Sequence, residues 1–170
     1  MAAKKQTGAK SGKRVDGTSR PIASNRRARH EYAVLDTVEA GIVLNGSEVK
    51  SLRLGQVQMA EGFARCQDGE LWLYGVHIAP YQFAAGFGSH DPDGRRKLLL
   101  HRAEIDRLQD RVAQERLALI PLSLYFKDGR AKVELALGKG RQKADKRDAI
   151  AERDSKREVE REMGRRNKGM

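Results

Sequence analysis

The sequence predicts a mainly β protein with small helices, most simply an OB-type antiparallel β-barrel that carries flexible basic arms at both ends. Three observations lead to this fold class. Two Asp-Gly pairs each separate two apolar runs, as in β-hairpins. Apolar and polar residues alternate within the middle of the chain, and the basic residues are concentrated at its two ends. A split α+β sheet is the alternative architecture.

Two hairpins account for most of the expected strands. Asp68-Gly69 and Asp128-Gly129 are turn signals, and apolar runs flank each of them. In the last run, apolar residues from Val133 onward alternate with mixed ones, so one face of that strand is apolar. An earlier run is rich in residues that favour β structure. The strands are expected over about residues 31–44, 63–67, 70–74, 117–126 and 131–137.

Two helices are expected between these strands. The first starts with capping residues at Asn45 and ends at Gly55, a common C-terminal stop. The second, over about residues 102–115, has one apolar face flanked by charged residues. Residues 79–96 contain several glycines and prolines and are expected to form a long loop.

The net charge of +11 is distributed unevenly over the 170 residues. Residues 1–30 hold nine Lys or Arg against one acid, and residues 139–170 hold 12 against seven. Residues 31–138 hold 13 bases and 15 acids. Basic arms on a nearly neutral body suggest a polyanionic partner, although the arms can also serve solubility alone. We therefore divide the chain into a disordered basic arm (1–24), a barrel (25–138) and a basic tail (139–170).

The tail favours a helix but supplies no apolar stripe to bury. It is rich in Ala, Glu, Arg and Lys and contains no proline. Arg153, Arg157 and Arg161 recur every four residues, so a helix places them in one slowly drifting row. We expect the free tail to be disordered or a fraying helix that becomes ordered against a polyanion.

Composition excludes several classes of protein. No stretch approaches the 18 apolar residues of a membrane span, and the polar start lacks a signal-peptide core, so we expect a soluble cytoplasmic protein. A single cysteine, Cys66, rules out an internal disulfide and a Cys-cluster zinc site. The histidines show no metal-ligand spacing, and His90-Asp91 has no nucleophile motif nearby. We expect no catalysis, no metal and no cofactor.

Eight short runs of the sequence occur together in one known family. They are residues 25–32 (NRRARHEY), 39–41 (EAG), 46–53 (GSEVKSLR), 96–101 (RKLLLH), 121–127 (PLSLYFK), 132–136 (KVELA), 139–141 (KGR) and 145–147 (DKR). In this order and spacing they resemble the SsrA-binding (small protein B) family, the tmRNA-binding proteins of bacterial trans-translation. The likeness extends from about Asn25 to Arg166 and implies an OB-type barrel with small helices.

The resemblance also implies a function. The family binds the tRNA-like domain of tmRNA and, with elongation factor Tu, brings it to ribosomes stalled without a complete codon. The basic C-terminal tail then occupies the empty decoding site and the downstream message channel. The implied partners are therefore tmRNA, the ribosome and, indirectly through charged tmRNA, elongation factor Tu. No cofactor and no catalysed reaction are implied, and we expect a monomer.

Three residues match positions that the family uses for tmRNA binding: Glu39, Leu99 and Lys132. A lysine can neutralise a phosphate, and a carboxylate can accept hydrogen bonds from base N–H groups or a 2′-OH. Each residue also has a structural alternative. Lys132 can be an ordinary solvated lysine on a strand, and Glu39 can form a hydrogen bond at a bend at Ala40-Gly41. Leu99 lies in an apolar run, where packing in the core is the default interpretation.

Two further sets of side chains suit RNA. A basic cluster precedes the barrel, where arginine can bind phosphates and stack on bases. Trp72 and Tyr74 share one face of a strand and can form a stacking platform, although we favour packing of Trp72 in the core. The basic cluster consists of Arg26, Arg27, Arg29 and His30, of which the histidine is the most ambiguous.

The tail matches the family's decoding-site segment except at one position. The position before the Asp-Lys-Arg run is often His or Tyr in the family, suited to stacking on a ribosomal base. Here it is Ala144, which cannot stack. Either the contact is dispensable or Lys143 or Arg141 replaces it through a cation–π contact. The tail residues implied to contact the ribosome are Gly140, Asp145, Lys146, Arg147, Arg153, Arg157 and Arg161.

Two other function classes stay open. A generic ribosomal or ribosome-assembly protein that binds rRNA can also combine an OB body with basic arms. An RNA-processing enzyme would need a metal or acid–base cluster, which the sequence does not show. The ordered set of family motifs favours the tmRNA-binding function over both.

Overall fold

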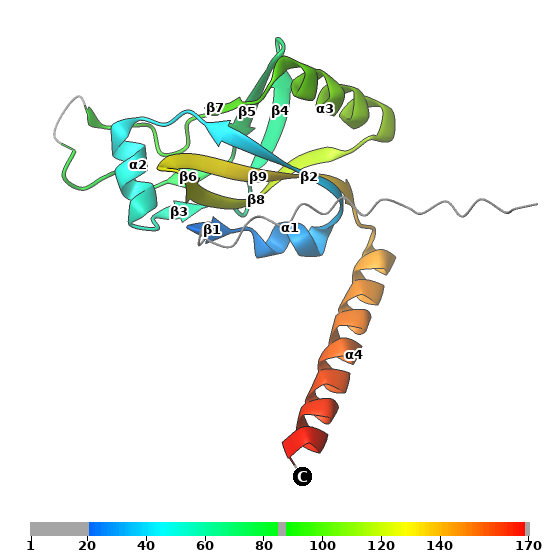
Figure 1. The fold of residues 1–170 in the computed structure, drawn as a ribbon. Helices are drawn as coiled ribbons and strands as arrows, with labels where there is room; N and C mark the ends of the chain where they lie inside the picture. Colours follow the sequence, from blue (N-terminus) through cyan, green and yellow to red (C-terminus); the bar gives the residue numbers. More distant parts are fainter. Residues whose placement is uncertain (1–20, 85–87, 169–170) are drawn as a thin grey trace, which may run out of the picture.

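The computed structural model describes residues 21–84 and 88–168, and this part of the chain is mainly β with small helices around one large sheet (Figure 1). The strands are β1 (Ala23–Ser24), β2 (Tyr32–Ile42), β3 (Val57–Gln58), β4 (Phe63–Gln67), β5 (Glu70–Tyr74), β6 (His77–Ile78), β7 (Arg96–Leu99), β8 (Ala118–Lys127) and β9 (Arg130–Gly140). The helices are α1 (Arg26–Glu31), α2 (Gly46–Arg53), α3 (Arg102–Glu115) and α4 (Lys143–Lys168). Figure 1 shows α2 and α3 at opposite ends of the sheet, and α4 pointing away from it.

Seven strands form one antiparallel sheet in the order β1-β8-β4-β5-β7-β2-β9. Because β8 pairs with β4 and also with β9, the pairings run round in a ring. The short strands β3 and β6 pair separately. The predicted fold class is confirmed: this ring of antiparallel pairings is consistent with an OB-like barrel. Within the ring, β2 and β9 lie across from β4 and β5.

Both predicted Asp-Gly hairpins are present. Asp68-Gly69 joins β4 to β5, and Asp128-Gly129 joins β8 to β9. All four turn residues have positive φ, 52° and 74° in the first turn and 52° and 73° in the second. Positive φ at both central residues is the geometry of a type I′ turn, which matches the twist of the strands it joins.

The helix boundaries follow from local capping. The backbone N–H of Asn45 donates to the carboxylate of Glu48 at 2.8 Å, and α2 stops before Gly55, whose φ is +72°. The sequence analysis did not predict α1. Asn25 begins this helix, because its side chain accepts a hydrogen bond from the backbone N–H of Ala28 at 3.0 Å. The Asn25 amide also donates to the carbonyl of Met59 at 2.9 Å, which fixes α1 against the loop before β4.

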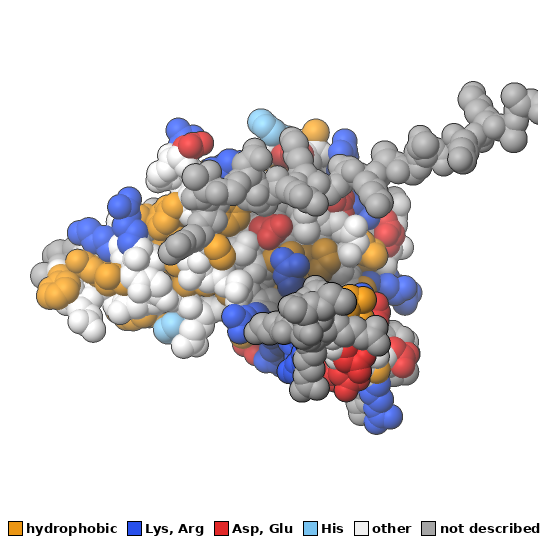
Figure 2. Space-filling model, turned by 60° about the horizontal axis from the view of Figure 1, so that its bottom comes forward, with side chains coloured by type: hydrophobic (Ala, Val, Ile, Leu, Met, Phe, Trp, Pro, Cys, Tyr) orange, Lys and Arg blue, Asp and Glu red, His pale blue; other side chains and the backbone are white. Residues whose placement is uncertain are grey.

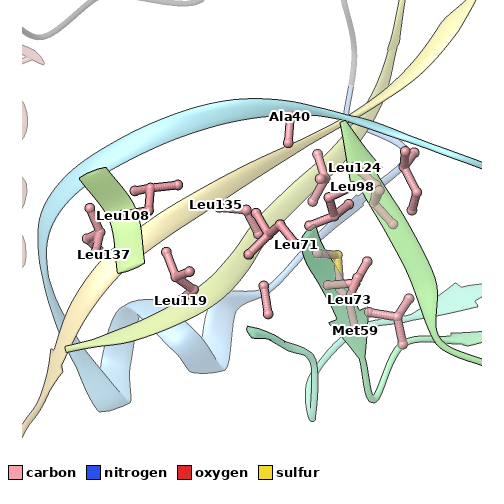
Figure 3. Packing of buried hydrophobic residues seen from close by; sticks show 14 of the residues in the cluster. Ala40, Met59, Leu71, Leu73, Leu98, Leu108, Leu119, Leu124, Leu135 and Leu137 are labelled. Atoms are coloured by element: carbon pink, nitrogen blue, oxygen red, sulfur yellow. The ribbon is translucent and has the colours of Figure 1, made fainter. Parts of the chain in front are cut away.

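The core is built largely from leucines that point inward from the long strands (Figure 3). Leu71 and Leu73 of β5 are buried, so Trp72 between them faces outward and is only half-buried. The interpretation of Trp72 as a core residue is therefore wrong. Its strand has apolar residues on both faces, and the aliphatic pair occupies the inner one. The labelled core residues in Figure 3 are Ala40, Met59, Leu71, Leu73, Leu98, Leu108, Leu119, Leu124, Leu135 and Leu137.

A buried ion pair joins α2 to the sheet. The guanidinium of Arg96 donates to the Glu48 carboxylate at 2.7 Å, and both side chains are less than a tenth exposed. Arg96 also donates to the carbonyl of Val76 at 2.6 Å, so its charge and donors are satisfied. His90 is buried nearby, with Nδ1 2.9 Å from the Ser47 hydroxyl. This histidine therefore holds part of the 79–96 loop against α2.

Candidate RNA-binding surface

The three residues singled out by the family resemblance lie together on the outer face of the sheet. Gly41 of β2 pairs with Leu99 of β7 on one side and with Lys132 of β9 on the other. Lys132 in turn pairs with Tyr125 of β8, whose hydroxyl donates to the Glu39 carboxylate at 2.5 Å. Four strands thus bring these side chains to one place. We call the residues Glu39, Leu99, Tyr125, Lys127 and Lys132 the β2–β9 surface.

Glu39 is held as an anion on this surface. The Nζ of Lys127 lies 3.4 Å from both oxygens of its carboxylate. The hydrogen bond from Tyr125, together with Lys127 and Lys132, holds the pKa of Glu39 below its ordinary value of 4.5, against the effect of partial burial. Burial and the adjacent carboxylate raise the pKa of Tyr125 above 10. The structural alternative for Glu39 is correct in part: its carboxylate accepts hydrogen bonds within the protein, but Ala40 and Gly41 lie inside strand β2 rather than at a bend.

Leu99 faces outward and is 52% exposed, whereas its neighbour Leu98 is buried. The default interpretation of Leu99 as a core residue is therefore wrong. A Cβ at Gly41 would lie 3.3 Å from the Cβ of Leu99, closer than most such contacts. The missing side chain at Gly41 thus lets Leu99 lie against the strand. The result is an apolar side chain on β7 beside the anion on β2, with Lys132 beyond it on β9.

The basic cluster on α1 lies at the other end of β2. Arg26 and Arg29 are exposed, and His30 is half-buried. Arg27 is engaged in ion pairs with Glu31 at 2.8 Å and Glu61 at 2.5 Å. Because α1 leads into β2 at Tyr32, seven residues before Glu39, the two basic regions are separated by about 20 Å along the strand. The structure does not bring the α1 cluster and the β2–β9 surface together.

Trp72 and Tyr74 lie on the outer face of β5, which pairs with β7, and Trp72 pairs with Lys97, two residues before Leu99. Aromatic rings and guanidinium groups contact one another there. The Arg95 guanidinium carbon is 4.4 Å from the Trp72 ring centroid. Tyr74 stacks on Phe63 with 5.3 Å between ring centroids. These rings face outward on β4 and β5, as a stacking platform requires. Use of this face by RNA stays a prediction.

The tail continues directly from the sheet. Gly140 is the last residue of β9 and pairs with Tyr32, and the N–H of Arg141 donates to the carbonyl of Glu31 at 2.9 Å. Helix α4 then carries the exposed side chains of Arg147, Arg153, Arg157 and Arg161. The side chains of Ala144, Asp145 and Lys146 lie outside the described residues. The four-residue spacing places the last three arginines on one drifting row, about 6 Å apart along the axis.

Tyr125 and Lys127 were missed as members of the site. Both belong to a run already noted for its family resemblance, and they lie one and three residues before the Asp128-Gly129 turn. Their contact with Glu39 spans more than 80 positions in sequence, so no local pattern reveals it. Within the described ranges there is no group of three His, Cys, Asp or Glu suited to a metal. In the same residues, no helix is long and apolar enough to cross a membrane.

Comparisons with known proteins agree with this picture. The family model described as "SmpB protein" matches residues 22–165. An SsrA-binding protein of Mycobacterium sp. (strain KMS) is 55% identical over 170 residues, covering 100% of this chain and 99% of its own. An SsrA-binding protein of Frankia casuarinae is 56% identical over 150 residues, covering 88% of this chain and 94% of its own.

A solved structure is also similar. It is described as "tmRNA-SmpB: a journey to the center of the bacterial ribosome". The matching chain has a TM-score of 0.61 and 47% sequence identity, and the match covers 77% of this chain and 95% of that one. At this identity and coverage the chain belongs to the SmpB protein family.

Proposed function

We propose that this protein binds the tRNA-like domain of tmRNA through the β2–β9 surface and delivers it to stalled ribosomes for trans-translation. One observation carries the proposal: Glu39, Leu99 and Lys132, far apart in sequence, converge on one outer surface in a chain of the SmpB family. The SsrA-binding relatives and the tmRNA-SmpB structure support the same RNA as the ligand.

Each residue of the surface has a distinct role in this proposal. Lys132 neutralises a phosphate, the interaction that dominates RNA affinity. Glu39 accepts a hydrogen bond from a base N–H or a 2′-hydroxyl, because Tyr125 and Lys127 keep its carboxylate ionised and oriented. Leu99 offers an apolar face to an unstacked base. The protein binds and positions RNA and catalyses no reaction itself.

Basic residues outside this surface extend the contact with RNA. Arg26, Arg29 and His30 of α1, with Arg27, contact the folded RNA at the other end of β2. The arginine row of α4, with Gly140 and residues 145–147, enters the decoding site and message channel, where rRNA phosphates favour the helix. With Ala144 before this segment, the contact depends on charge rather than stacking. The protein acts as a monomer and meets elongation factor Tu only through charged tmRNA.

Equilibrium binding of the full chain to a transcript of the tRNA-like domain tests the proposal. Glu39→Ala and Lys132→Ala should each weaken binding by roughly 1–3 kcal/mol, or five- to 150-fold, with native circular dichroism. Arg107→Ala, on the exposed side of α3, is the matched control and should leave affinity unchanged. Equal affinity for an rRNA fragment of the same length would favour the ribosomal-protein alternative instead.

A further inference from the structure

A pocket adjoins the β2–β9 surface and shares Leu99 and Lys132 with it. Its volume is about 450 Å³, and it opens between α2 and the hairpin that joins β8 to β9. Its other lining residues have no part in the RNA contacts proposed above for the β2–β9 surface. The lining consists of Gly41, Ile42, Leu44, Val49, Leu99, Phe126, Gly129, Arg130, Ala131 and Lys132.

The walls of this pocket are apolar and partly flat. Phe126 of β8 and Leu99 of β7 provide two walls, and Val49 of α2 provides a third. The Arg53 guanidinium carbon lies 5.5 Å from the centroid of the Phe126 ring, so a cation already covers one face of that ring. Gly41 adds no side chain between Leu99 and Lys132, which keeps the pocket continuous with the β2–β9 surface.

The charged residues that line this pocket are all basic. Arg130 and Lys132 line it, and no carboxylate is among its lining residues. Another pocket, of about 540 Å³ between α1, α3 and β4, differs, because Glu31 and Glu61 lie in its lining beside Arg27 and Arg65. Figure 2 shows hydrophobic and basic side chains next to one another toward the end of the molecule that carries α2 in Figure 1. An apolar floor with a purely cationic rim suits an aromatic ring attached to phosphates.

We propose that this pocket binds one unpaired nucleobase of the RNA that occupies the β2–β9 surface. The base contacts Leu99 and the accessible part of the Phe126 ring, which also packs against the core, and Lys132, Arg130 and Arg53 bind the phosphates on either side of the base. The inference rests on the proposed function and deepens it, since it adds Phe126, Arg130 and Arg53 to Leu99 and Lys132 as residues that contact the RNA. The cationic rim distinguishes a nucleotide from an apolar side chain of a protein partner, for which fixed positive charge is of no use.

Abasic substitution in the RNA, combined with mutation of the pocket, tests the inference. Each unpaired nucleotide of a tRNA-like-domain transcript is replaced in turn by an abasic one, and binding to the full chain is measured. One position, or two adjacent ones, should lower affinity roughly tenfold, as expected for a lost stacking contact. The Phe126→Ala variant should bind the abasic RNA and the intact RNA with equal affinity, because this variant has already lost the contact with the base.

Controls separate this inference from the proposed function. We call the dependence of the abasic effect on a pocket residue coupling. Leu99→Ala changes an exposed side chain and should likewise abolish the effect of the abasic position. It replaces Phe126→Ala if thermal melting shows that the latter is unfolded. Phe63→Ala, on the opposite side of the ring, should leave the coupling intact. Tight binding without any abasic position coupled to Phe126 or Leu99 would overturn the pocket alone. Failure of the wild-type chain to bind the transcript would overturn the proposed function as well.

Discussion

Removing the Tyr125 hydroxyl should destabilise the protein modestly and in a pH-dependent way. In Tyr125→Phe, Glu39 loses the 2.5 Å hydrogen bond but keeps Lys127 at 3.4 Å. A hydrogen bond to a charged group contributes about 1.5–3 kcal/mol. Because the Glu39 side chain is 34% exposed, hydrogen bonds from water replace part of this contribution, and we expect the free energy of unfolding to fall by about 1 kcal/mol at pH 7. For a chain of this size the melting temperature should fall by about 2–4 °C.

The direction of the pH effect follows from the ionisation of Glu39. Its pKa in the folded protein is below 4.5, so the stabilisation is present above about pH 4.5 and is lost as the pH falls through the folded value. Urea denaturation at pH 7 and at pH 3.5 should therefore show a smaller difference between wild type and Tyr125→Phe at the lower pH.

The matched control for this experiment is Tyr74→Phe. The Tyr74 hydroxyl donates to the neutral side chain of Gln67 at 3.0 Å on an exposed surface. Its removal should cost little, and equally at both pH values. An equal cost of Tyr125→Phe at pH 7 and pH 3.5, or the same pH dependence in Tyr74→Phe, would refute the assigned role of Glu39.

Three further predictions concern charge. The logarithm of the association constant for RNA should fall with the logarithm of the salt concentration by roughly 0.7–0.9 per phosphate neutralised. Lys132→Ala should make this slope shallower by the contribution of about one phosphate. An unchanged slope would mean that this lysine contacts no phosphate. Truncation before Asp145 should leave tmRNA binding nearly intact but abolish peptide transfer on stalled ribosomes, since the described side chains of α4 are exposed; loss of binding would place the tail in the RNA-binding body. Glu48→Ala should cost about 3–5 kcal/mol in urea denaturation, because the buried charge of Arg96 loses its carboxylate. Its control is Glu70→Ala, which breaks the exposed ion pair with Lys97, the residue after Arg96 on β7, and should cost at most about 1 kcal/mol. Similar losses of stability in Glu48→Ala and Glu70→Ala would contradict this reasoning.

The parts of the fold that depend on local chemistry could be predicted from the sequence. Asp68-Gly69 and Asp128-Gly129 each tolerate two successive positive φ values and are flanked by apolar runs, so the turns and their strands could be predicted. Asn45 and Gly55 likewise marked the ends of α2. Helix α1 was missed because its six residues lack an apolar face and depend on the contact of Asn25 with a distant loop.

The side chains that make up the surface were harder to assign, because strand parity is ambiguous in uniformly apolar runs. Residues 70–74 and 96–100 each place apolar residues on both faces, and the core takes Leu71, Leu73 and Leu98. Trp72 and Leu99 then face outward. The contact of Tyr125 with Glu39 depends on how β8 and β2 both pair with β9, which no local spacing encodes. The family resemblance identified Glu39, but only the structure explains how a carboxylate is maintained at an RNA-binding surface.

Site-specific photocrosslinking tests the central proposal most directly. A benzophenone amino acid replaces Leu99, which is an exposed member of the β2–β9 surface, or Arg107, on the exposed side of α3. Each full-length variant is irradiated with the tRNA-like domain of tmRNA at a concentration where binding is saturated. If the β2–β9 surface is the RNA-binding site, position 99 should give a strong crosslink to the RNA and position 107 should give none. Crosslinking from position 107 with none from position 99 would contradict it.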